Sequence, residues 1–76
     1  MNQATRKQIQ HLTDQLEDIM HHLTHFGELE LEKFENMPEA LQDSEQGQAL
    51  EEAGDTLQQA AHELLDIIET IQTAAQ

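Results

Sequence analysis

The chain has no cysteine, tryptophan or tyrosine, and only one proline and three glycines among its 76 residues. The absence of cysteine excludes a disulfide framework and a thiolate zinc site, and it is typical of proteins of a reducing compartment. No apolar run approaches the roughly 18 residues of a membrane span, and the first residues lack the apolar segment of a signal peptide. We therefore expect a cytoplasmic protein with no membrane partner.

Basic residues are also scarce. Three lysines and arginines stand against sixteen aspartates and glutamates, which gives a formal net charge of −13. Nucleic acids and anionic membranes attract clustered cations, so we expect no direct binding to DNA or RNA. A macromolecular partner of this chain is expected to be basic.

Apolar residues in the N-terminal half follow the period of an α-helix. They alternate steps of three and four residues, which marks one face of a long amphipathic helix: Ile9, Leu12, Leu16, Ile19, Leu23 and Phe26. Thr5 and Gln8 have the spacing of a capping box, and Pro38 disfavours helical geometry at the residue before it. The pattern predicts a helix over about 5–35.

A second helix is predicted over about 45–75, after a turn over about 36–44 in which Pro38 can begin one short helical turn. Asp43 or Ser44 can cap this second helix. Its apolar residues again step in heptads: Leu50, Ala53, Leu57, Ala60, Leu64, Ile67, Ile71 and Ala74.

A second apolar stripe lies beside these heptad positions. It consists of Ala61, Leu65, Ile68 and Ala75. A single neighbouring helix cannot cover both stripes. We therefore predict that the first stripe fills the seam between the two helices and that the second stripe is an oligomer interface.

Two long helices joined by a short turn predict an all-α fold, an antiparallel, coiled-coil-like two-helix hairpin in a single domain over 1–76. Residues at the same level should have numbers that sum to about 80, which places Gly27 beside Gly54. These glycines are either tolerated packing sites or the mark of a close helix approach or hinge. Because a hairpin this small needs further support, we expect a homodimer that forms a four-helix bundle, with higher closed assemblies as the alternative.

Little in the sequence points to catalysis. Ser44 is the only serine, and it is expected to cap a helix. The carboxylates lie on a solvated surface without an aromatic wall to raise their pKa, so acid–base chemistry is not expected. We predict no enzymatic activity, no catalytic residues and no cofactor.

The histidines are more suggestive of a ligand site. Glu17, His21 and His25 recur at every fourth residue, and Asp18 and His22 form a neighbouring set with His25. Either set would hold Zn²⁺, Ni²⁺ or Cu²⁺ loosely. Exposed histidines at such outward positions are usually solvated, and we predict no metal site.

The strongest feature is a concentration of acidic residues around the turn. Ten acids lie between residues 28 and 55, namely Glu28, Glu30, Glu32, Glu35, Glu39, Asp43, Glu45, Glu51, Glu52 and Asp55. With Lys33 as the only base, these 28 residues carry −9. The cluster is either a solvated surface that keeps an oligomer soluble or a binding surface for a basic partner. A side-by-side dimer would carry twice 13, or 26, negative charges. Over a length of about 45 Å this is roughly one charge per 1.7 Å, which is about the axial charge spacing of duplex DNA.

The amino-acid sequence of the turn region resembles that of a group of known proteins. Phe34-Glu-Asn-Met-Pro-Glu-Ala-Leu-Gln42 and Ser44-Glu-Gln-Gly-Gln-Ala-Leu-Glu-Glu-Ala53 resemble the turn of short acidic helical proteins encoded by phages and mobile elements of Gram-positive bacteria. The resemblance covers only this part of the chain and implies no active residues. It implies an inhibitor that acts in the cytoplasm of a host cell by occupying the nucleic-acid-binding site of a defence or transcription protein.

Three functions are therefore open. The first is a non-enzymatic phage-type inhibitor whose acidic surface binds a basic host protein, such as a defence nuclease or a transcription factor, by mimicking nucleic acid. The second is a structural coiled-coil module that assembles with itself or another helical protein, its acidity serving solubility. The third is a small antikinase-like or chaperone-like hairpin that docks on a partner bundle.

Overall fold

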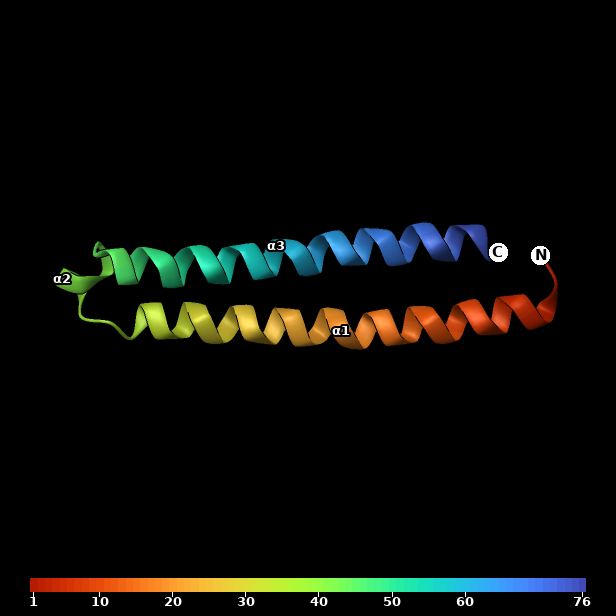
Figure 1. Ribbon diagram of the computed structural model, residues 1–76, viewed down its shortest axis with the longest axis horizontal. Coiled ribbons are helices and arrows are strands. Elements are labelled where there is room, and N and C mark those ends of the chain that lie inside the picture. The colour runs from red at the N-terminus through yellow and green to blue at the C-terminus, as the bar shows by residue number, and fades with distance from the viewer.

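A computed structural model describes all 76 residues, of which 67 are helical. Helix α1 spans Gln3–Glu35, the short α2 spans Glu39–Gln42, and α3 spans Glu45–Ala74. Helices α1 and α3 lie side by side and run in opposite directions, with both chain ends at one end of the molecule and α2 at the other (Figure 1). The molecule is a rod of 59 × 15 × 12 Å. The prediction of an all-helical chain is confirmed.

Local sequence explains where α1 begins and ends. The side chain of Asn2 accepts a hydrogen bond from the backbone N–H of Thr5 at 2.8 Å, so Asn2 is the N-cap. The helix therefore begins two residues before the predicted Thr5, which lies inside it. It ends at Glu35, as predicted, because the geometry before Pro38 cannot continue a helix.

The turn is held by side-chain hydrogen bonds to the backbone. The Ser44 hydroxyl caps α3 and accepts from the N–H of Gly47 at 3.2 Å, which confirms one of the two predicted caps. The amide of Gln42 donates to the carbonyl oxygens of Phe34 at 3.3 Å and of Met37 at 3.4 Å. The carbonyl oxygen of Phe34 also accepts from the backbone N–H of Met37 at 3.1 Å, so the Gln42 side chain ties the end of α2 to the end of α1.

The backbones of α1 and α3 come into contact at a pair of glycines. A Cβ atom on Gly54 would lie 2.5 Å from Cγ of Leu31 and 3.1 Å from the carbonyl oxygen of Gly27, and one on Gly27 would lie 2.7 Å from Cγ of Gln58. Both glycines are buried, and both have ordinary helical backbone angles. Their role is therefore a close helix approach, and their predicted position at one level is confirmed.

Steps of seven residues from this glycine pair trace the seam between the two helices. They reach Thr13 on α1 and Ile68 on α3, each 1% exposed, and Ala61, which is 4% exposed. The Thr13 hydroxyl is satisfied, since it donates to the carbonyl oxygen of Gln10 at 2.9 Å. The seam thus consists mainly of small side chains, with Ile68 as its one large fully buried apolar residue.

This seam corrects the predicted one. Ala61 and Ile68, assigned from the sequence to an oligomer interface, already cover α1 within the single chain. Leu12, Ile19 and Phe26, assigned to the seam, are 54%, 48% and 54% exposed. The physical reason is distance: helices that touch at two glycines are too close for large side chains between them, so these move to the flank.

We predict that Gly54→Ala lowers the free energy of unfolding by about 1–3 kcal/mol, because the added methyl group overpacks the seam. Alanine is the better helix former by about 1 kcal/mol, so propensity alone predicts stabilisation. Urea denaturation at fixed protein concentration measures the sign. As a control, His21→Ala at an exposed α1 position should change stability by less than about 0.5 kcal/mol. A more stable Gly54→Ala protein would contradict the close approach.

Candidate functional site

The large side chains displaced from the seam form one exposed surface, which we call the apolar face. Its members lie beside the seam on the same side of both helices: Ile9, Leu12, Leu16, Ile19, Leu23 and Phe26 on α1, and Leu50, Ala53, Leu57, Ala60, Leu64, Ile67, Ile71 and Ala74 on α3. Leu12, Ile19, Phe26 and Ile67 are about half exposed, at 48–54%. Large apolar side chains in a continuous exposed stripe mark a surface that contacts another protein.

The apolar face is grooved. An open groove of about 470 Å³ is lined by Ile9, Leu12, Leu16 and Ile19 of α1 and by Ile71 of α3, with Gln15 at its edge. This lining shows that residues from both helices share the face. A second hollow of about 490 Å³ runs along α3 beside Ala53 and Leu57. Glu52 and Thr56 also line this second hollow, so it is more polar than the first.

The opposite side of the helix pair carries a smaller hollow of about 280 Å³. Its lining includes Met20, Ala61, Leu65 and His62. Of the residues predicted to form an oligomer interface, Leu65 and Ala75 are half-buried, while Ala61 and Ile68 are fully buried. The exposed stripe is the one that the sequence assigned to the seam between the helices. Gly54 and Ala61 in the seam are small residues seven apart, but the stripe of larger side chains has the same spacing, so spacing alone does not identify the seam. Gly47, seven residues before Gly54, packs against the carbonyl oxygens of Leu41 and Gln42 instead.

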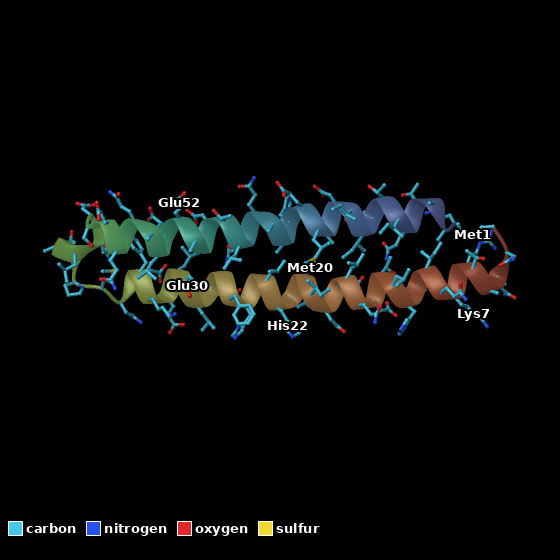
Figure 2. All side chains as sticks on the ribbon, viewed as in Figure 1. Met1, Lys7, Met20, His22, Glu30 and Glu52 are labelled. Carbon is cyan, nitrogen blue, oxygen red and sulfur yellow. The ribbon has the colours of Figure 1, made fainter.

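The ten acidic residues of the turn region form the second candidate surface, the acidic end. It comprises Glu28, Glu30, Glu32, Glu35, Glu39, Asp43, Glu45, Glu51, Glu52 and Asp55, and it spans both long helices (Figure 2, where Glu30 and Glu52 are labelled). Lys33 donates to Glu30 at 3.1 Å in the only salt bridge of the chain. The other nine carboxylates are exposed and have no cationic partner.

Charge is therefore polarised along the rod. The acidic end carries −9 of the net −13, so the rest of the chain carries −4. Lys7 lies at the opposite end, near Met1 (Figure 2), and Arg6 precedes it in α1. The Arg6 guanidinium donates to the carbonyl oxygen of Gln76 at 3.5 Å, which links α1 to the C-terminus.

The remaining candidates do not form a chemical site. No three histidines or carboxylates are arranged to hold a metal ion, and this includes both predicted sets around His25. His22 points away from α3 into solvent (Figure 2). The Ser44 hydroxyl is engaged at the cap and also donates to the carbonyl oxygen of Leu41 at 2.5 Å.

Comparisons of this chain with protein-family models, with curated proteins and with solved structures find no match. The resemblance of the turn to acidic phage proteins stays a prediction. Neither long helix contains a stretch apolar enough to cross a membrane.

Two adjacent isoleucines test which stripe is the seam. We predict that Ile68→Ala lowers the free energy of unfolding by about 2–5 kcal/mol, because it leaves a cavity at a fully buried site. Ile67→Ala, at a site 52% exposed, should cost less than about 1 kcal/mol in dilute protein. It should instead weaken self-association, which light scattering over a concentration series measures. Equal losses of stability in the two variants would contradict the observed seam.

Proposed function

We propose that this chain is a non-enzymatic binding protein, a dimeric four-helix bundle whose acidic ends bind a basic surface on a partner protein in place of nucleic acid. The observation that carries the proposal is the group of nine exposed carboxylates at one end of the rod without a cationic partner.

The position of the acids favours a binding surface over a general solubility device. A charge that served only solubility would do so from any part of the surface, yet −9 of −13 lies in 28 residues. Helix dipoles stabilise Glu39 and Glu45, which lie in the first turns of α2 and α3. The other acids gain nothing of this kind and repel one another. A basic partner relieves that repulsion and is attracted from a distance.

The charge density resembles that of a nucleic acid. A dimer would carry 26 formal negative charges, twice the 13 of one chain, along the 59 Å rod. That is one charge per 2.3 Å, somewhat sparser than the 1.7 Å expected from the sequence but close to duplex DNA. Proteins that hold DNA or RNA in a cationic groove are the class of partner that such a surface fits.

Surface area supports a dimer. The single chain exposes 5649 Å², whereas a compact protein of 8.7 kDa exposes about 4700 Å². The excess is on the order of 900 Å², similar to the roughly 800 Å² that each partner contributes to a standard interface. The apolar face supplies a continuous surface of suitable chemistry, and burying it on a second copy completes a four-helix bundle.

The resemblance of the turn suggests the biological setting. In that setting the chain is an inhibitor encoded by a phage or mobile element, acting in the cytoplasm of the host cell. Its target is a defence nuclease or a transcription factor, whose cationic groove the acidic end occupies.

One second function is favoured by a specific observation. The apolar face alone supports a structural assembly module, in which the bundle forms with itself or with another helical protein and the acids only keep it soluble. The two functions differ in which surface the partner contacts and in the effect of salt on binding.

We predict that Glu28→Gln, Glu32→Gln, Glu35→Gln and Glu39→Gln together reduce capture of a basic, nucleic-acid-binding protein from bacterial lysate at least tenfold. Raising the salt concentration from roughly 50 to roughly 200 mM, or adding duplex DNA, should release the same protein from the parent chain. Quantitative mass spectrometry of the captured fraction measures both effects.

The matched control neutralises four carboxylates outside the acidic end, by Asp18→Asn, Glu63→Gln, Asp66→Asn and Glu69→Gln. All four side chains are exposed, so both quadruple variants lose the same charge. The control should capture the partner as the parent does. If both variants bind like the parent and only Ile19→Lys on the apolar face fails, the assembly module replaces our proposal.

A further inference from the structure

We infer that the second copy docks on the apolar face in the antiparallel sense, so that the two acidic ends lie at opposite ends of the bundle. The inference rests on the dimer of the proposed function and adds its orientation. Three features of the molecule support it: the symmetry of the apolar face, the groove within it, and the polarised charge.

The apolar face is centred on the middle of the rod. Ile19 is the middle residue of α1, which spans Gln3–Glu35, and Leu12 and Phe26 lie two turns to either side of it. A two-fold axis at the level of Ile19, perpendicular to the rod, therefore superposes the central part of the apolar face, from Leu12 to Phe26, on itself. Residues of the two α1 helices that face each other then have numbers that sum to 38. Ile19 faces Ile19, and Leu12 faces Phe26.

The groove matches this register. It is lined by Ile9, Leu12, Ile19 and Ile71, and so it lies at the level of Leu12. Phe26 is 54% exposed and is the largest side chain of the apolar face. In the antiparallel dimer Phe26 of the second copy lies over this groove, and the reciprocal contact forms at the other end. Such self-complementarity is what a two-fold interface requires.

Apolar packing by itself permits a second orientation. With the two-fold axis along the rod, the acidic ends lie together, Phe26 faces Ala53 of the second copy, and Ile19 faces Ala60. Large side chains then meet small ones, which is also acceptable packing. Charge is what separates the two orientations.

Facing end charges repel less in the antiparallel dimer. There, the acidic end of each copy, with −9, faces the end of the other copy that carries both termini and Arg6 and Lys7, whereas in the other orientation the two acidic ends face each other, −9 against −9. The register also brings Arg6 and Lys7 level with Glu32 and Leu31 of the second copy, inside its acidic end. The Coulomb repulsion between two facing acidic ends is larger at low salt, so the antiparallel orientation is favoured most strongly there.

The orientation has a consequence for binding. The two acidic ends of the dimer point in opposite directions along a rod of 59 Å, so each can bind a separate basic molecule. The expected complex has two copies of this chain and two copies of the partner. In the other orientation, one merged acidic surface would bind a single partner.

Spin labels measure the orientation directly. The chain has no cysteine, so Ala40→Cys places one label on each copy, at an exposed site in α2 that carries no charge. We expect a label–label distance above roughly 45 Å, since the 33 residues of α1 alone span about 50 Å. Mixing this protein with Gln3→Cys protein should give a short distance between the two labels, because the end of one copy that carries both termini lies beside the acidic end of the other.

The outcomes separate the inference from the proposal on which it rests. A dimer with an Ala40→Cys label distance near the helix spacing, roughly 10–20 Å, overturns the orientation but leaves the proposed dimer standing. A monomer in light scattering, at concentrations where the labelled chain is helical, overturns both. Binding of a partner by the acidic end is tested separately, by the glutamine variants.

A charge-swap experiment gives an independent reading. Ile19→Glu and Ile19→Lys should each raise the dimer dissociation constant at least tenfold, and mixing the two should restore a dimer, because Ile19 faces its own copy. His22→Glu, exposed and off the apolar face, should leave the parent dimer unchanged. If the mixed Ile19 variants stay monomeric while His22→Glu dimerises, Ile19 does not face itself and the antiparallel register is wrong.

Discussion

The contact between the backbones of α1 and α3 at Gly27 and Gly54 governs the rest of the structure. A Cβ atom at either position would come within 3.1 Å of the carbonyl oxygen of the other glycine. Helices held this close leave little room in the seam, where Leu31 packs against Gly54 and Ile68 is the one large apolar residue that is fully buried. The large side chains of the same amphipathic helices therefore lie beside the seam and in solvent. The close approach thus creates the apolar face, which no second part of the chain covers.

A rod 15 × 12 Å in cross-section has almost no interior. Ala61 and Ile68 are its only fully buried apolar residues, while Leu12, Ile19, Phe26 and Ile67 are about half exposed. Hydrophobic stabilisation grows with the apolar area removed from water, so a single copy gains only part of the hydrophobic free energy that its apolar residues can supply. The proposed bundle is the arrangement that would bury the apolar face and gain this stabilisation.

Charge and apolar surface divide the molecule between them. On α1 the apolar face ends at Phe26 and the acidic residues begin at Glu28, whereas on α3 Glu51, Glu52 and Asp55 lie at the same level as Leu50 and Ala53 of the apolar face. One surface is suited to a second copy and the other to a basic partner, and Glu52, which lines the hollow beside Ala53 and Leu57, lies where the two surfaces meet. Because the acids lie near one end, the orientation of the dimer decides how many separate acidic surfaces it presents.

The sequence by itself determined the local structure: two long helices from the apolar period, the end of α1 before Pro38, the Ser44 cap, the level of the glycine pair and the concentration of charge. Each depends on neighbouring residues or on composition. The start of α1 was misplaced by two residues, since Asn2 rather than Thr5 takes the cap. Only the tertiary structure decided which apolar stripe is the seam. Both stripes have heptad spacing, and hydrophobic burial favours the one with larger side chains, Leu12, Ile19 and Phe26. The backbone contact at Gly27 and Gly54 reverses that preference, because closeness between two helices is set by the smallest residues that face each other.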